Sequence, residues 1–287
     1  MASFDSQLME LYRNKPECVI GLPEWLLTPQ SIEEFKAVPR LAVVEIAGRD
    51  SVAAAVKSVQ DESFTDLVPT YVYTGTEHGQ WSSVTEAVER LAMRLPHVQV
   101  HRLLVLGSPG FWHALNGRFI AELISRYGFY TPCIGCHAYL HGVRIPLALV
   151  LGAVPIISGE RESHDGATKV NQVSEALDFY ENLGKDYGAR FAFPLRKVAQ
   201  GDRISEILGF KWQEGKGQLG CVLSGNYREL DGSASATTWQ VQRYLEEFVR
   251  PCVKGILNSY VAGQIPDHLK IAAQVLASPY PTRKAIP

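Results

Sequence analysis

Two cysteines that could bind a metal or react as thiolates stand three residues apart at the expected start of a helix. Thr131 suits an N-cap and Pro132 the first helical position, so Cys133 and Cys136 fall in the first turn. Residues i and i+3 share one helix face, and the two sulfurs should point the same way. Because a helix N-terminus favours the thiolate, we expect lowered thiol pKa values. The pair could be a zinc half-site, a redox pair or two ligands of an iron–sulfur cluster.

Further cysteines could complete this set. Cys221 lies on a glycine-rich loop that bends easily, whereas Cys252 falls on the apolar stripe of a helix, a position more typical of a core. Cys18 stands alone near the N-terminus and is interpreted as structural. We therefore predict as metal ligands Cys133, Cys136 and Cys221. His137 and His141, four residues apart on the cysteine helix, could be a second metal pair, although ordinary helix residues near the site are the simpler interpretation.

A second chemical signal is the stretch from residue 41 to 56, LAVVEIAGRDSVAAAV. It has the order of a buried strand, a tight turn at Ala47-Gly48 and a helix that opens with Asp50-Ser51. Such a turn leaves backbone N–H groups unpaired at the positive end of the helix dipole. An anion, most often a phosphate, binds readily there, so we predict a nucleotide site. Asp50 and Ser51 could instead be simple helix caps.

The surrounding pattern must position these groups, and it alternates strands with helices. This alternation predicts an α/β fold, a doubly wound parallel sheet with helices on both faces. The expected strands are 41–46, 67–73, 98–106, 154–158 and 191–194; the expected helices are 51–59, 82–94, 111–127 (interrupted at 116–117), 133–151 and 170–182. Ligands in such sheets bind beyond the carboxyl ends of the strands. The turns 47–51, 74–78, 107–110 and 158–166 should therefore converge on one site.

The sequence divides into three parts in this interpretation. Residues 1–39 form an N-terminal helical extension with short helices at 6–14 and 31–36, and residues 40–198 form the nucleotide-binding domain. Residues 199–287 form a less regular C-terminal region that packs on it and contains an amphipathic helix at 239–260.

Composition limits the classes of partner and the cellular location that we expect. The net charge of −2 excludes a basic field for non-specific nucleic-acid binding, and no apolar run approaches the roughly 20 residues that span a membrane. The N-terminus lacks the pattern of a signal peptide, and five cysteines in 287 residues do not make a disulfide framework. We expect a cytoplasmic protein with no membrane partner.

The turn also carries a family resemblance. The segment IAGRDS resembles a degenerate form of the SGGxDS loop of the PP-loop ATP pyrophosphatases, the adenine nucleotide alpha hydrolase-like group. In this alignment Ile46 and Ala47 stand where the family has its Ser and first Gly, and Gly48, Asp50 and Ser51 match. The resemblance covers about residues 40–230. A strand that ends in Ser158-Gly159 fits a second position of the family.

The resemblance implies roles for particular residues. Asp50 and Arg161 would be catalytic, and Arg49 could supply charge to the phosphates, while His164-Asp165 are candidates for phosphate or metal contacts. The implied nucleotide-binding residues are Ala47, Gly48, Arg49, Asp50, Ser51, Thr74, Gly75, Ser158 and Gly159.

What the resemblance implies for function is ATP-dependent adenylation with Mg²⁺. The adenylated acceptor would then receive sulfur from a 4Fe–4S cluster or a cysteine persulfide. Cys133, Cys136 and Cys221 resemble the three-cysteine arrangement that holds such a cluster in sulfur-handling members, with Zn²⁺ as the other candidate. The acceptor would be a small molecule or a tRNA base, and a homodimer is expected. Two alternatives remain: a sulfonucleotide reductase-like enzyme, and a non-catalytic nucleotide-binding module with structural zinc.

Overall fold

The computed structural model describes residues 3–213, 215–231 and 233–278. Within these residues the main sheet is parallel, with the order β4-β2-β1-β6-β7, and β5 continues beside the second half of β2. The strands of this sheet are β1 (Leu41–Glu45), β2 (Asp66–Val72), β4 (Gln99–Val100), β5 (Leu104–Leu106), β6 (Ile156–Ile157) and β7 (Phe191–Ala192). A separate antiparallel pair joins β3 (Glu77–His78) to β8 (Gly220–Cys221).

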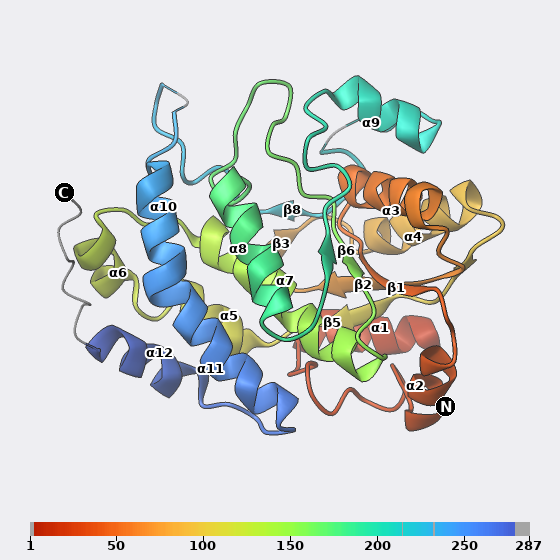
Figure 1. Cartoon of the computed structure of the whole chain (residues 1–287), viewed down its shortest axis with the longest axis horizontal. Helices are drawn as coiled ribbons and strands as arrows, with labels where there is room; N and C mark the ends of the chain where they lie inside the picture. The colour runs from red at the N-terminus through yellow and green to blue at the C-terminus, as the bar shows by residue number, and fades with distance from the viewer. Residues whose placement is uncertain (1–2, 214, 232, 279–287) are drawn as a thin grey trace.

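Helices cover both faces of the sheet (Figure 1). One layer consists of α1 (Phe4–Asn14), α3 (Arg49–Glu62), α4 (Ser82–Arg94) and α9 (Gly201–Leu208). The other contains α5 (Pro109–Asn116), α6 (Ile120–Tyr127), α7 (Pro132–Val150), α8 (Ser174–Lys185), α10 (Thr238–Tyr244), α11 (Arg250–Val261) and α12 (His268–Ala277). The short α2 (Pro29–Lys36) packs at the edge of this second core through Ile32 and Phe35.

The central strand β1 explains why the fold is layered. Its side chains alternate between the two cores, with Leu41 and Val43 in the layer of α7 and Ala42 and Val44 in the layer of α3. All four are buried, as expected for a parallel strand covered on both sides. The α/β doubly wound architecture predicted from the sequence is therefore confirmed.

Several predicted elements need correction. The expected strand 98–106 is two short strands separated by residues 101–103, where the Arg102 guanidinium donates to the carbonyls of Trp25 and Leu26. The helix expected at 170–182 begins at Ser174. The helix expected at 239–260 contains a π-helical turn, Leu245–Val249, which ends two residues before Pro251, a residue with no N–H to continue the α-helical ladder.

The C-terminal region is more regular than the sequence indicates. Helices α9 and α12 and the pair β3–β8 were not predicted, and α11 and α12 pack against α7 and α5. The helix interruption predicted at 116–117 is present between α5 and α6.

Among the described residues, α7 is long and apolar enough, by length and composition, to cross a membrane. It lies instead between α5, α8 and α11 with most of its surface buried. This is the environment of a core helix in a soluble α/β protein.

Candidate active site

The order of the strands creates a switch point beside β1. β2 and β4 lie on one side of this strand and β6 and β7 on the other, so the segments that follow β1 and β6 leave in opposite directions. In doubly wound sheets a ligand crevice opens at such a point, beyond the carboxyl ends of the strands. A cavity of about 530 Å³ lies here, and the segments after β1 and β2 contribute Ala47 and Thr74 to its wall.

The three predicted cysteine ligands all line this cavity. Thr131 caps α7 as expected, because its hydroxyl accepts a hydrogen bond from the Cys133 N–H, and this places Cys133 and Cys136 in the first turn. Cys221 belongs to a segment that is distant from α7 in the sequence. Because β8 pairs with β3, Cys221 lies opposite Glu77. The structure thus brings together side chains from two distant segments.

Each sulfur has polar neighbours. The Cys221 Sγ lies 3.2 Å from the Thr76 hydroxyl, and the Trp112 indole N–H donates to the Cys136 Sγ at 3.3 Å. The Cys133 thiol donates to the Asn226 side-chain oxygen at 3.5 Å, and Asn226 also accepts from the Thr131 hydroxyl. The loop after β8 therefore closes over the first turn of α7.

The expected lowering of the thiol pKa values is wrong. Burial raises the pKa of both Cys133 and Cys136, even though the Thr131 and Trp112 hydrogen bonds oppose the shift. Desolvation penalises the thiolate, and here it outweighs the helix N-terminus. The neighbouring thiols add to the effect, because a second negative charge nearby disfavours ionisation.

Among the described residues, the three cysteines do not form a compact group of metal ligands. With Zn–S bonds of about 2.3 Å, tetrahedral geometry sets sulfurs roughly 3.8 Å apart. Among the described residues, a single group of three metal-ligating side chains has all its ligand atoms within 4.8 Å of one another, and it is not the three cysteines.

The turn after β1 is closed in this structure. The backbone N–H groups of Ala47 and Gly48, expected to be unpaired, both donate to the Ser51 hydroxyl oxygen at 2.9 and 3.0 Å. The Gln218 side chain lies over Gly48, where an added Cβ would be 2.2 Å from its Oε1. Ala47 reaches the cavity wall, but Gly48 and Ser51 are buried behind it.

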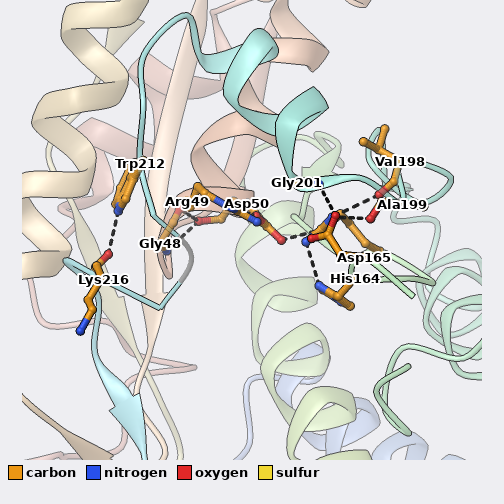
Figure 2. Close-up of polar contacts among 12 residues, drawn as sticks. Gly48, Arg49, Asp50, His164, Asp165, Val198, Ala199, Gly201, Trp212 and Lys216 are labelled. Atoms are coloured by element: carbon orange, nitrogen blue, oxygen red, sulfur yellow. Dashed lines mark hydrogen bonds and ion pairs between the residues drawn. The ribbon is translucent and has the colours of Figure 1, made fainter. Parts of the chain in front are cut away.

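Asp50 lies between two arginines rather than at the cavity. Its carboxylate oxygens pair with the Arg49 Nε at 2.9 Å and the Arg161 Nε at 2.8 Å. Arg161 is fully buried and also donates to the carbonyl oxygens of Val198 and Ala199. Figure 2 shows Asp50 between the turn at Gly48 and the segment around residue 199. Arg161 therefore holds the Asp50 carboxylate and does not line the cavity.

The other predicted residues hold the turns together. Gly159 packs so closely on the first turn of α3 that an added Cβ would lie 2.6 Å from the backbone of Asp50. Ser158 donates its hydroxyl to the carboxylate of Glu45. The N–H groups of Thr74 and Gly75 both donate to the Glu77 carboxylate, which fixes the turn after β2.

Sequence reasoning missed several charged groups in the cavity wall, among them Arg144 and Glu45. Arg144 is buried in α7, where its Nε donates to the Thr70 hydroxyl at 2.9 Å and its Nη1 to the Leu140 carbonyl at 2.7 Å. Glu45 ends β1 and lines the same wall. A lone arginine in an apolar helix and a carboxylate at the end of an apolar strand were the available signals.

A third group joins His137 and His141 to Glu160. The Nδ1 of His137 and the Nε2 of His141 lie 2.8 and 3.0 Å from the same oxygen, Oε1 of Glu160. Burial acts to lower the pKa of His137, but the Glu160 charge and hydrogen bond outweigh it and raise that pKa. Burial acts to raise the pKa of Glu160, yet the two histidines hold it well below its usual value.

The sequence has a clear relative among curated proteins. No family model matches the chain. It is 36% identical over 259 residues to "Uncharacterized protein MJ0009" of Methanocaldococcus jannaschii, across 86% of this chain and 93% of the relative. The chain belongs to the family of this archaeal protein. The name of the relative states no activity.

In chemical terms the cavity combines soft and charged groups. Three thiols face a wall that also carries Arg144, Lys169 and Arg228, together with the carboxylates of Glu45 and Glu77. Such a wall can hold an anionic or polar ligand beside sulfur. A volume of about 530 Å³ is also within the usual range for small-molecule sites, roughly 300–1,000 Å³.

Proposed function

We propose that this chain is an ATP-dependent enzyme that adenylates an oxygen of an acceptor and then replaces that oxygen by sulfur. The observation that carries the proposal is the convergence of Cys133, Cys136 and Cys221 with the segment after β1 around one cavity. In many proteins a strand–turn–helix of the PP-loop type or a set of thiols serves a function of its own. Their meeting at the switch point of one sheet favours a joint reaction.

ATP would bind at the N-terminus of α3, with its phosphates directed to the turn of Ala47 and Gly48. The Gln218 side chain would move aside, since it is flexible and covers Gly48 in this structure. An acceptor oxygen attacks the α-phosphorus, the bond to the bridging oxygen of the β-phosphate breaks, and pyrophosphate leaves. A sulfur nucleophile then attacks the activated acceptor carbon, and AMP leaves with the oxygen.

The chain's own charges fit this chemistry. Arg144, Lys169 and Arg228 line the cavity and would stabilise negative charge on the phosphates and on the departing AMP. Both oxygens of Asp50 are paired with arginines, so Mg²⁺ would enter with the nucleotide, bound mainly by phosphate oxygens.

The three cysteines fit an iron–sulfur group in donor type, and all three line one cavity. Such a group would supply reduced sulfur beside the acceptor. Its binding would also deprotonate thiols whose pKa values burial otherwise raises. The cysteines themselves hold the group and direct it at the cavity.

The acceptor is proposed to be a small molecule in a cytoplasmic protein. The cavity volume suits such a molecule, and the net charge of −2 gives no general attraction for tRNA. A tRNA base remains the other acceptor, and homodimerisation stays a prediction.

A second candidate function is a cysteine-dependent metal or cluster protein that binds no nucleotide. The closed turn favours it, because the amides of Ala47 and Gly48 are satisfied by Ser51 and Gly48 is covered by Gln218. This candidate predicts bound metal without any affinity for ATP.

Calorimetric titration of the anaerobically purified chain with Mg·ATP separates the two candidates. We expect binding with a dissociation constant below about 1 mM, the upper range of ordinary substrate affinities. Asp50→Asn should weaken it, because the paired Asp50 orders the turn. Asp61→Asn, at the exposed end of the same helix, is the matched control and should bind as wild type does. Absence of Mg·ATP binding at millimolar concentration would remove the adenylation proposal and favour the second candidate.

A further inference from the structure

We propose that His137, His141 and Glu160 form a site for one divalent transition-metal ion of the zinc type, separate from the three cysteines. This inference does not depend on ATP or on sulfur transfer. Within the described part of the chain, this is the group of three metal-ligating side chains whose ligand atoms all lie within 4.8 Å of one another.

The backbone fixes this geometry. His137 and His141 are four residues apart on α7 and so lie one above the other on the same helix face. Glu160 comes from the segment after β6, which carries its carboxylate to that face. Two imidazoles and one carboxylate form a common donor set of catalytic zinc and of non-haem iron.

The donor atoms of two pairs lie slightly closer together than the ligands of one bound ion would. The histidine nitrogens lie 2.8 and 3.0 Å from Oε1 of Glu160. Zinc bonds of about 2.0–2.2 Å in tetrahedral geometry place nitrogen and oxygen ligands roughly 3.4 Å apart. An ion would therefore need each of these two pairs to open by about 0.5 Å.

Burial gives the ion a physical reason to bind. The Glu160 and His141 side chains are 3% and 1% exposed, so the carboxylate is removed from water and must be compensated within the protein. A divalent ion supplies that compensation and leaves both imidazoles neutral. His137 is 25% exposed and lines the cavity, so the open coordination position would face the same space as the thiols.

Neighbouring side chains hold the carboxylate in the required orientation. The Gln172 amide donates to the other oxygen of Glu160, which leaves Oε1 for the histidines, and the Gln172 carbonyl oxygen lies 2.5 Å from the His164 Nε2. Such outer partners commonly orient metal ligands. The Nδ1 of His141 has no hydrogen-bond partner within the described residues, and ring packing on Tyr180, 4.6 Å away, sets the orientation of this imidazole.

Cobalt titration tests the site without interference from the thiols. In a full-length chain with Cys133→Ser, Cys136→Ser and Cys221→Ser, we expect one Co²⁺ per chain. Its spectrum should show visible d–d bands and no thiolate charge-transfer band, and Zn²⁺ should displace it. No stoichiometric Co²⁺ binding by the folded three-serine chain overturns the proposal.

Single substitutions in this background identify the ligands. Glu160→Gln and His137→Ala should each weaken Co²⁺ binding by at least about 100-fold, and Gln172→Ala by roughly 10- to 100-fold, the usual effect of an outer partner. Glu162→Gln is the matched control, because Glu162 lies two residues away and pairs with Arg196 and Lys197.

Unchanged binding in Glu160→Gln and His137→Ala overturns the assignment. If Glu160→Gln fails to fold by circular dichroism, His137→Ala decides alone, since that side chain is partly exposed. If the three-serine chain does not fold, wild type and His137→Ala are compared directly. A loss of one Co²⁺ per chain supports the site, and no loss overturns it.

Discussion

Gly159→Ala tests whether the segment after β6 is locked against the first turn of α3. A Cβ on Gly159 would lie 2.6 Å from the backbone C of Asp50 and the N of Ser51, whereas ordinary contact begins near 3.4 Å. The two segments must therefore separate by the difference of 0.8 Å. Both sides of this contact are backbone, so no flexible side chain can absorb the change.

Overpacking of this kind typically costs about 1–3 kcal/mol, and we expect about 2 kcal/mol of lost unfolding free energy. For a chain of this size that corresponds to a fall in Tm of roughly 4–8 °C. Gly48→Ala is the matched control. Its Cβ would meet the Gln218 side chain, at 2.2 Å from Oε1, and that flexible side chain can swing away. The loss of unfolding free energy in Gly48→Ala should stay below about 1 kcal/mol.

Urea and thermal unfolding followed by circular dichroism measure both variants. We expect a clearly larger loss of unfolding free energy in Gly159→Ala than in Gly48→Ala. Equal losses, or a larger one for Gly48→Ala, would show that the contact between the two segments is not rigid and would refute the argument.

Three further predictions concern single side chains. Iodoacetamide at pH 8 should modify the exposed Cys221 well before the partly buried Cys136, whose thiol pKa is raised by desolvation. Mass spectrometry of timed samples gives the order, and faster reaction at Cys136 would contradict it. Burial lowers the pKa of His268 to about 4. As pH falls below 6.5, the imidazole therefore takes up its proton in the unfolded chain before it does so in the folded chain. The contribution of His268 to stability is complete above pH 6.5 and is lost towards pH 4. This pKa shift corresponds to a loss of at most about 3 kcal/mol of unfolding free energy, and we expect about 1–2 kcal/mol because the ring is partly exposed. Urea titrations from pH 7 to 4 should show this loss in wild type and a smaller one in His268→Gln. Gln218→Ala should strengthen Mg·ATP binding by roughly threefold to tenfold, since no side chain has to be moved from Gly48; calorimetry that shows weaker binding would contradict the proposed place of the phosphates.

The fold was predictable where the signal is local. The apolar run of β1, the glycine turn and the alanine-rich start of α3 follow one another within twenty residues, and the structure has them in that order. The capped first turn of α7 is equally local, because Thr131 and Pro132 act on their immediate neighbours.

What depends on distant contacts could not be predicted. β3 and β8 are each two residues long and form only because Glu77 pairs with Cys221, which lies about half the chain away in the sequence. The raised pKa values of Cys133 and Cys136 likewise reflect the loops that bury them, whereas the sequence shows only the helix N-terminus.

The same limit applies within the site. The sequence places Asp50 and Arg161 near a nucleotide, but it does not reveal that they pair with each other and leave the cavity wall to other residues. Glu160 could be noticed only as one charge in a polar run. Its role follows from the meeting of that run with one face of α7.

The central claim is that Cys133, Cys136 and Cys221 act together in one cavity, and iron and sulfide analysis of anaerobically purified protein tests it most directly. The account predicts iron and acid-labile sulfide in equal amounts in wild type, their loss in Cys221→Ser, and their retention in Cys252→Ala, where the cysteine is buried in the core. Wild-type protein without iron, or a Cys221→Ser variant that keeps its full iron content, would contradict it.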